Sequence, residues 1–292
     1  MMVKREKKLQ IIIINWNSSA HIANCISSLM ECCESEGFYI TVVDNSSPDF
    51  LEINRLTKIC RIDQLIELKS NLGFSGGNLK GFKPGFDFYL MLNPDVVFLK
   101  DSIKACFEIF NKNSNIGIAS VCHLNSDGTE QASYFSKPNP WQFVFNNIKL
   151  SSICKDNKGD NEIDWVCGSF LMVKREVIEK IGFLDPSYFL NNEDIDFCLR
   201  VRESGWEIKI DKNNPIIHKG GSSRESMNNP KFTYMRSNLL FLWKKGYYLI
   251  CFLYYATGCA NLLFTCIKSG FCKKAWGDFT KFLFLKPVKS GI

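Results

Sequence analysis

The stretch LQIIIINWNSSAHIANCISSLM, residues 9–30, decides the fold class. Leu9–Ile14 contains four consecutive isoleucines, which is typical of a strand buried on both faces of a parallel sheet. Ser18 and Ser19 follow a polar turn and are candidate caps of a helix. The apolar positions of this helix recur at helical spacing, at Ile22, Cys25, Ile26 and Leu29. The stretch therefore predicts a strand, a turn and a helix.

The same alternation of strand and helix continues outward from this stretch. Further strands are predicted at residues 38–43, 64–68, 88–92 and 116–121, with a helix opened by Asp101 and Ser102. Such alternation favours right-handed crossovers, and hence an α/β fold with a mostly parallel central sheet and helices on both faces. After an irregular region, the pattern predicts a strand at 167–174 and helices at 175–181 and 193–204.

Polar clusters follow three of the predicted strands. They are Asn15–Asn17, Asp44–Ser47 and Asn93–Asp95. Asn, Asp and Ser are ordinary turn formers, so one cluster alone would mean little. Three clusters at the carboxyl edge of one sheet indicate a binding site, because ligands of open α/β sheets bind there.

Six segments together resemble the family 2 glycosyltransferases, which share a nucleotide-binding fold called GT-A. The resemblance covers about residues 8–245. Within the family, the chain looks most like bacterial rhamnosyltransferases that build cell-surface polysaccharides. Each motif is weak by itself, and six in order are specific. The segments are IIIINWNS (11–18), VVDNSSPD (42–49), NLGFSGGN (71–78), LNPDV (92–96), WVCGSFLMVKREVIEKIGFLD (165–185) and FLNNEDIDFCLR (189–200).

The resemblance implies a site for a nucleotide-sugar donor. The acid matching Asp44 receives the imide N–H of a uracil or thymine base in that family. Gly73, Gly76 and Gly77 precede a predicted helix, where a backbone without Cβ atoms can approach a phosphate, although they also suit a structural turn. The implied donor-binding residues are Asn15, Asn17, Asp44, Asn45, Asn71, Gly73, Gly76, Gly77, Asn78 and Asn93.

The resemblance also implies a divalent cation, Mg²⁺ or Mn²⁺, held by Asp95. The family motif is usually Asp-x-Asp, whereas this chain reads Asn93-Pro94-Asp95, so Asn93 supplies only a neutral oxygen. One carboxylate plus substrate phosphates is workable for Mg²⁺. His218 corresponds to a family position that can join the metal or the diphosphate.

Asp194 is implied as the base that removes the proton of the acceptor hydroxyl in an inverting transfer. Glu193 is an alternative base, and both acids also suit simple charge complementarity at a helix start. Asp196 and Arg200, one turn apart, are expected to pair structurally. Trp165, with Gly168 and Ser169, is the candidate acceptor side; Trp165 also suits a core position.

Charge and composition divide the chain. Residues 231–292 hold ten Lys or Arg and the single acid Asp278, so the net charge of +6 arises in this tail. A basic tail rich in aromatics favours an anionic membrane surface and argues against nucleic acid as partner. We expect a GT-A catalytic domain at 1–230, with nucleotide-sugar binding in about 1–125 and the acceptor side in about 126–230. The tail at 231–292 is expected to be a helical membrane anchor.

The tail contains 21 uncharged residues at 247–267, long enough to span a bilayer. Lysines on both flanks conflict with the positive-inside rule for a span and favour a helix that lies in the interface or re-enters it. A true span and a soluble packing helix remain alternatives. The apolar run after the basic N-terminus is too short for a signal peptide, and scattered cysteines suit a reducing compartment. We expect the cytoplasmic face of the cell membrane, with a homodimer possible.

The sequence thus predicts an inverting, metal-dependent transferase that moves a sugar, plausibly rhamnose from dTDP-rhamnose, to a lipid-linked or polysaccharide acceptor. Transfer of another sugar from a UDP donor is the alternative within the same class. A catalytically silent scaffold is the alternative from another class, because Asn93 stands where the family prefers Asp. A nucleotidyltransferase would leave residues 165–200 without a role.

Overall fold

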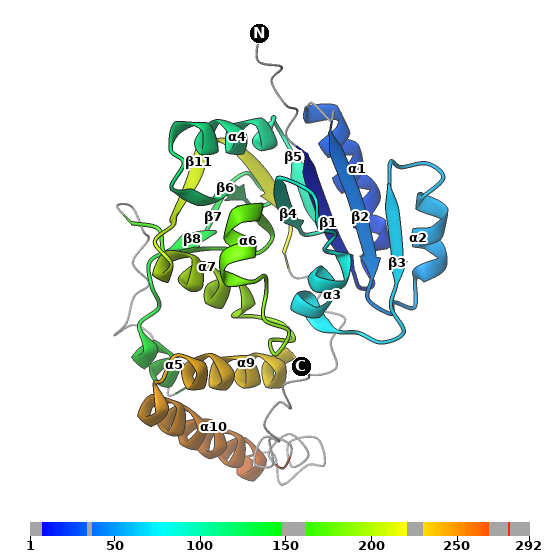
Figure 1. Cartoon of the computed structure of the whole chain (residues 1–292). Helices are drawn as coiled ribbons and strands as arrows, with labels where there is room; N and C mark the ends of the chain where they lie inside the picture. The colour runs from blue at the N-terminus through cyan, green and yellow to red at the C-terminus, as the bar shows by residue number, and fades with distance from the viewer. Residues whose placement is uncertain (1–7, 34–36, 148–161, 221–229, 269–279, 281–292) are drawn as a thin grey trace.

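The structure, a computed structural model, describes residues 8–33, 37–147, 162–220, 230–268 and 280. Its centre is a nine-stranded sheet (Figure 1). Strand order along the main path is β3-β2-β1-β4-β10-β6-β11-β5, and β7 pairs with β6. A separate two-stranded sheet joins β8 (Tyr134–Phe135) to β9 (Trp165–Val166).

The first half of the chain forms a parallel block. It consists of β1 (Leu9–Asn15), β2 (Phe38–Asp44), β3 (Gln64–Glu67) and β4 (Phe88–Leu92). β1 lies between β2 and β4, so Ile13 is opposite Val42 on one side and Leu92 on the other. The polar residues that follow these strands therefore lie at one edge of the sheet.

The second half adds strands of both directions. They are β5 (Val96–Phe98), β6 (Ile116–Leu124), β7 (Glu130–Gln131), β10 (Phe170–Lys174) and β11 (Glu207–His218). β10 is antiparallel to β4 and to β6, and lies between them, whereas β11 is parallel to β6. β6 and β11 consequently run in the same direction as the first four strands, which confirms a mostly parallel sheet with antiparallel insertions.

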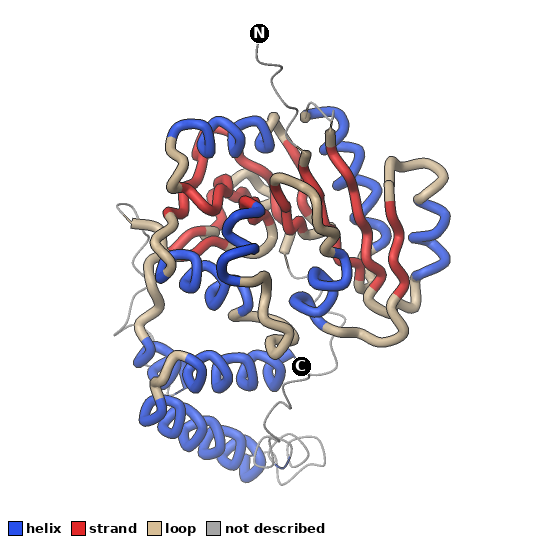
Figure 2. Tube along the Cα trace, viewed as in Figure 1, coloured by secondary structure: helices blue, strands red, loops and turns tan. Residues whose placement is uncertain are grey.

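Helices cover both faces of the sheet, as predicted (Figure 2). One face packs against α1 (Ser19–Cys32), α2 (Phe50–Leu56) and α4 (Ser102–Lys112). The other packs against α3 (Gly73–Gly81), α6 (Arg175–Ile181) and α7 (Glu193–Glu203). α4 begins as expected, because the Asp101 side chain accepts a hydrogen bond from the Lys104 N–H at 2.9 Å.

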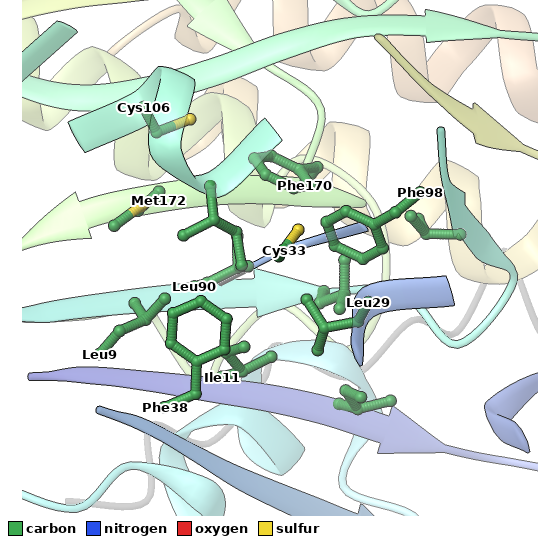
Figure 3. Close-up of a cluster of buried hydrophobic side chains, with 14 of the residues drawn as sticks. Leu9, Ile11, Leu29, Cys33, Phe38, Leu90, Phe98, Cys106, Phe170 and Met172 are labelled. Atoms are coloured by element: carbon green, nitrogen blue, oxygen red, sulfur yellow. The ribbon is translucent and has the colours of Figure 1, made fainter. Parts of the chain in front are cut away.

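The isoleucines of β1 divide between the two faces. Ile11 and Ile13 join the large core cluster under α1 and α4, part of which Figure 3 shows, whereas Ile12 and Ile14 join the cluster under α3. β1 is buried along its whole length. Because burying one such side chain contributes about 1.5–3 kcal/mol, this strand is a main source of stability.

α3 lies unusually close to the sheet. A Cβ atom at Gly81 would come within 2.7 Å of the Ile12 side chain, and one at Gly77 within 3.1 Å of Ile14. A Cβ at Gly76 would come within 2.6 Å of Leu72. The expectation that Gly76 and Gly77 precede the helix is wrong: both lie inside α3, where the missing Cβ atoms permit packing.

Three helices form a layer below the sheet domain in Figure 1. They are α5 (Pro140–Asn147), α9 (Pro230–Lys244) and α10 (Tyr248–Lys268). Val144 of α5 packs with Leu242, Ile250 and Tyr254. The expected tail is thus helical where described, and α9 and α10 pack on a helix from the expected acceptor half. The expected boundary near residue 230 stays a prediction.

Candidate active site

Five of the six motif segments line one cavity at the carboxyl edge of the sheet. The cavity is small, about 50 Å³, so it can enclose only part of a nucleotide sugar. Its wall includes Phe189 and Leu190, which come from a segment more than 90 residues away from the others. The remaining lining residues are Ile14, Trp16, Asn45, Asn71, Gly73, Phe74, Asn93 and Pro94.

Asn15 joins the first two motifs. Its amide donates to Asp44 Oδ1 at 2.8 Å and to Ser47 Oγ at 3.1 Å, and its Oδ1 accepts from the Ser18 N–H. Asp44 is fully buried, and its other carboxylate oxygen accepts from the Ser47 N–H at 3.0 Å. Asp44 therefore stabilises this loop from inside. Its contact with the uracil or thymine base of a donor stays a prediction.

Asp49 makes the hydrogen bond at the start of α1 that the sequence analysis expected from the capping serines. Its carboxylate accepts from the Ser19 N–H at 3.0 Å at the start of α1, while the Ser18 hydroxyl donates to the Trp16 carbonyl. Ser18 occupies the N-cap position without making the capping hydrogen bond. Asn17 is exposed, with a positive φ of 54° and its N–H donating to Ser47 Oγ.

Asn45 and Gly73 connect the second motif to α3 and to the active-site loop. The Asn45 side chain donates to the Gly73 carbonyl at 3.0 Å and accepts from the Leu72 N–H at 2.8 Å. Gly73 has a φ of +73°, and a Cβ there would lie 1.9 Å from the Phe189 carbonyl oxygen. Only glycine permits this approach. Asn78 is fully buried within α3 and donates to the Phe74 carbonyl, away from the cavity lining.

The fold places His218 beside Asp95 through strand pairing. β11 is antiparallel to β5, with His218 opposite Val96. His218 Nε2 lies 3.4 Å from Asp95 Oδ1 and 3.3 Å from the Asn93 amide nitrogen. His218 Nδ1 lies 2.7 Å from Gln131 Oε1, which can only accept, so Nδ1 carries the proton. In the neutral ring, Nε2 then presents its lone pair towards Asp95.

A second histidine lies behind this pair. The rings of His123 and His218 have centroids 5.6 Å apart, and His123 Nδ1 is 3.4 Å from Ser169 Oγ. Burial, together with the neighbouring His218, lowers the pKa of His123 to about 3. His123 is therefore neutral near pH 7 and adds no positive charge to the site.

Asp194 has two backbone donors. The Gly168 N–H donates to its Oδ2 at 3.0 Å and the Ile195 N–H to its Oδ1 at 2.9 Å. Burial raises the pKa of Asp194, and these two hydrogen bonds oppose that rise because they stabilise the carboxylate. The result is a carboxylate held in one orientation with an affinity for protons above that of an ordinary aspartate.

Glu193 differs from its neighbour. It is only 5% exposed, and its Oε2 lacks a hydrogen-bond partner. Burial, and then the charge of Asp194, raise the pKa of Glu193 well above its usual value. Burial therefore disfavours the charged form of Glu193 more than that of an ordinary glutamate.

Gly168 and Ser169 connect the two key acids. Gly168 donates to Asp194, and the next residue, Ser169, accepts at its carbonyl from the Asn93 N–H at 2.9 Å. One dipeptide thereby joins the start of α7 to the loop that carries Asp95. Trp165, by contrast, stacks on Phe135 with ring centroids 4.2 Å apart and donates to the Ser136 carbonyl. These contacts favour the core alternative for Trp165.

The residues present fit a divalent cation with help from a substrate. Asp95 and His218 supply one oxygen and one imidazole nitrogen, and Gln131 orients the imidazole in the manner of outer partners of metal ligands. Within the described residues, however, no group of three or more His, Cys, Asp or Glu is arranged to hold a metal ion. Two protein ligands require diphosphate oxygens and water for the rest of the coordination.

The sequence analysis did not identify the residues that hold the start of α7. Asn192, with a φ of 67°, donates through its side chain to Asn238 Oδ1 at 2.8 Å, and the Asn238 amide donates to the Tyr254 hydroxyl at 3.0 Å. Ser237 Oγ donates to the Leu190 carbonyl at 2.6 Å. The Asn191-Asn192 pair was a usable signal, since Asn tolerates a positive φ. Nothing local in sequence marks Asn238 or Gln131.

This sheet, with a nucleotide-type edge, an Asp95–His218 pair and a buried Asp194, defines the class of GT-A-like glycosyltransferases. The family model described as glycosyl transferase family 2 matches residues 10–182, more than half of the chain. The chain belongs to this family.

Curated relatives are glycosyltransferases. The low-salt glycan biosynthesis hexosyltransferase of Haloferax volcanii is 31% identical over 208 residues, 68% of this chain and 63% of the relative. The chain thus aligns with less than two thirds of that protein. The rhamnosyltransferase WbbL of Escherichia coli is 22% identical over 80% of this chain and 92% of its own. The N-acetylglucosaminyl-diphospho-decaprenol L-rhamnosyltransferase of Mycobacterium tuberculosis is 21% identical over 80% and 83%.

Two solved structures share the fold. The mannosyltransferase of Pyrobaculum calidifontis, solved with GDP-Man and Mn²⁺, aligns with a TM-score of 0.54 at 12% identity over 97% of this chain and 86% of that one. GalNAc-T7, solved with UDP, GalNAc and Mn²⁺, gives 0.55 at 11% over 74% and 44%. At these identities the likeness establishes the GT-A fold, as the sequence predicted.

Proposed function

We propose that this protein is a metal-dependent inverting glycosyltransferase that takes a sugar from a nucleoside diphosphate donor. The observation that carries the proposal is the Gly168–Ser169 bridge, which fixes Asp194 relative to the loop of Asp95. An inverting transfer needs a base on the side of the anomeric carbon opposite the departing diphosphate. Gly168 holds Asp194 itself and Ser169 holds Asn93, two residues before Asp95, an arrangement that suits these two tasks.

The chain's own groups then divide the reaction. Asp194 accepts the proton of the acceptor hydroxyl while the oxygen of that hydroxyl bonds to the anomeric carbon. The bond from that carbon to the diphosphate oxygen breaks, and the electron pair leaves with the diphosphate. Asp95 and His218 would hold Mg²⁺ or Mn²⁺, which as a Lewis acid neutralises the charge of the diphosphate when bound. The hydrogen bond between Asn15 and Asp44 stabilises the loops at the carboxyl edge of the sheet, where the nucleotide is proposed to bind.

Donor and acceptor are proposed from the relatives. Two of them are named rhamnosyltransferases, and the mycobacterial name specifies a diphospho-decaprenol acceptor. We therefore propose rhamnose, from a dTDP donor, and a lipid-linked glycan acceptor. The apolar side chains that α5, α9 and α10 expose support work at a membrane surface, and the cytoplasmic face is proposed from the sequence.

The proposal is tested by thermal unfolding of the full chain with a panel of nucleotide sugars, with and without Mn²⁺. A ligand at about a hundred times its Kd adds about 2.7 kcal/mol, which for a chain of this size raises Tm by roughly 5 °C. We expect one dTDP- or UDP-sugar to do so only with Mn²⁺, and Asp95→Ala to abolish the shift.

Glu108→Ala, which removes an exposed acid from the outer side of α4, is the matched control and should keep the full shift. A shift that survives EDTA, or that Asp95→Ala leaves intact, would contradict the assignment of Asp95. Binding without release of nucleoside diphosphate in the presence of any glycan acceptor would favour the scaffold alternative.

A further inference from the structure

A second cavity, of about 220 Å³, lies between the loop before α7 and the side of α9. Ser187 and Phe189 contribute the loop side of its wall. Phe232, Arg236 and Ser237 are among the residues that contribute the α9 side. It is large enough for a phosphate or diphosphate group, and the proposed mechanism does not use it.

This cavity adjoins the donor cavity. Phe189 lines both of them. The hydrogen bond from Ser237 Oγ to the Leu190 carbonyl, at 2.6 Å, ties α9 to the same segment. Leu190 lies four residues before Asp194. The second cavity therefore borders the segment that leads to the start of α7, where Asp194 lies.

The charge of the cavity comes from Arg236. Its side chain is exposed, and no carboxylate of the described residues forms an ion pair with it. The next two lysines along the chain differ, because Lys244, the last residue of α9, pairs with Asp185 and Lys245 with Glu203. A guanidinium without a protein carboxylate, in a cavity that also contains hydroxyl groups, is suited to bidentate binding of a phosphate.

The cavity also has an apolar exit. Phe232 packs against the cluster of Met235 and Leu262, which α9 and α10 share. Beyond it, these two helices carry eight of the twelve large hydrophobic side chains that the described residues expose. A ligand with an anionic group at Arg236 can therefore continue as an apolar chain over α9.

We propose that Arg236 and the cavity beside it bind the phosphate or diphosphate of an amphiphilic acceptor, whose sugar then extends past Phe189 to Asp194. This inference rests on the proposed function, and specifies its acceptor as an anionic group that carries an apolar chain. The phosphate could belong to the acceptor itself or to a membrane lipid headgroup, and the test separates these sources.

The test is titration calorimetry of the full chain with farnesyl diphosphate. Arg236→Gln should weaken binding about tenfold or more, as expected for loss of a charge-assisted bidentate contact, while Arg236→Lys retains part of the affinity. Phe232→Ala should weaken binding of farnesyl diphosphate but not of inorganic pyrophosphate. Arg55→Gln, which removes another exposed arginine, from α2, is the control and should change nothing.

Unchanged farnesyl diphosphate affinity in Arg236→Gln overturns the proposal, as does an equal loss in Arg55→Gln. If Arg236→Gln instead loses binding to phosphatidylglycerol vesicles and keeps farnesyl diphosphate, the cavity recognises a lipid headgroup and the acceptor assignment is wrong. If it weakens the Mn²⁺-dependent nucleotide-sugar affinity, the cavity belongs to the donor.

Failure here is distinguishable from failure of the proposed function. The function is tested by Mn²⁺-dependent nucleotide-sugar binding, to which Arg236 makes no proposed contact. A wild-type chain that binds the donor, together with an Arg236→Gln variant that binds farnesyl diphosphate normally, rejects this site alone. Absence of donor binding in the wild type rejects the transferase proposal, whatever the farnesyl diphosphate result.

Discussion

At the scale of single residues, two adjacent carboxyls have opposite surroundings. Asp194 receives hydrogen bonds from the backbone of Gly168 and Ile195, whereas Glu193 is buried with one oxygen unpaired. Burial raises both pKa values, and the charge of Asp194 raises that of Glu193 further, whereas Asp194 receives backbone hydrogen bonds from two other residues, Gly168 and Ile195, which oppose the rise. The difference supports the proposal that Asp194, rather than Glu193, is the base.

Asp194→Asn should lower kcat about a thousandfold, because general base catalysis typically contributes a factor of a hundred to ten thousand. The Kd for the donor should change less than threefold, since the side-chain carbonyl oxygen of Asn can still accept one of the two backbone N–H hydrogen bonds that hold Asp194. Single-turnover kinetics with donor titration measures both quantities.

Glu193→Gln is the matched variant. It retains the shape of a neutral carboxyl, so kcat should stay within about fivefold of the wild type. A large loss of kcat in Glu193→Gln with little loss in Asp194→Asn would exchange the two roles. Equal loss of donor affinity in both would indicate that neither residue acts as the base.

At the scale of elements, the start of α7 is held from below by α9 and α10. The buried chain of side-chain hydrogen bonds runs from Asn192 through Asn238 to Tyr254. On the other side, Arg200 pairs with Asp196 as expected, and also donates to the carbonyls of Ile181 and Phe183. The C-terminal helices therefore contribute to the position of Asp194, the proposed base, as well as to the outer surface.

Asn238→Ala should lower kcat about tenfold and leave the donor KM unchanged. The reason is that Asn192 loses its partner in a buried place, so the turn that positions Asp194 relaxes. The free energy of unfolding should fall by about 1–3 kcal/mol, the cost of a buried unpaired amide. Steady-state kinetics and denaturant unfolding measure these changes.

Asn147→Ala serves as the control for this coupling. Asn147 donates to the Tyr254 carbonyl and to Thr257 Oγ1, so it fastens α5 to α10 without touching the loop before α7. It should lower stability while keeping kcat. Asn238→Asp, which can accept from both Asn192 and the Tyr254 hydroxyl, should restore most of the rate. A kcat that follows stability alone in all three variants would reject the positioning role.

At the scale of the whole molecule, α10 has one side on the protein and one side open. Its inward positions recur every four residues, from Ile250 to Cys266, and pack on α9 and α5. By length and composition α10 could cross a bilayer, although a core helix can meet the same criteria. The outward side carries exposed apolar residues, namely Tyr248, Leu249, Phe252, Leu263, Phe264 and Ile267.

This arrangement suits a helix that lies along a membrane surface, because the inward side is already occupied by protein. Replacing Phe252 and Phe264 together with serine should weaken co-sedimentation with phosphatidylglycerol vesicles at least tenfold, since each buried aromatic contributes on the order of 2 kcal/mol. Activity towards a water-soluble acceptor should remain.

The control is the pair Leu51→Ser and Ile59→Ser, which removes two equally exposed apolar side chains from the region of α2. It should leave vesicle binding unchanged. Equal binding of the Phe252 and Phe264 variant and the wild type would favour the alternative in which α10 is a packing helix of a soluble protein or oligomer.

The sequence by itself determined the features that depend on local pattern. Four consecutive isoleucines define the central strand, the Asp101 start of α4 is visible in the chain, and the order of six motifs identifies the fold. These features follow from periodicity and from residue type within a few positions. The proposed metal ligands Asp95 and His218 and the proposed base Asp194 could also be named, because their motifs are local.

Only the tertiary structure decided which residues support them. Gln131 orients His218, the Gly168–Ser169 dipeptide joins two acids, and Asn238 holds Asn192, each across dozens of residues. The insertion of antiparallel β10 between β4 and β6 is likewise invisible in a strand's own pattern. Such contacts depend on side chains that meet only after the strands of the sheet have paired. Local propensity carries no information about them.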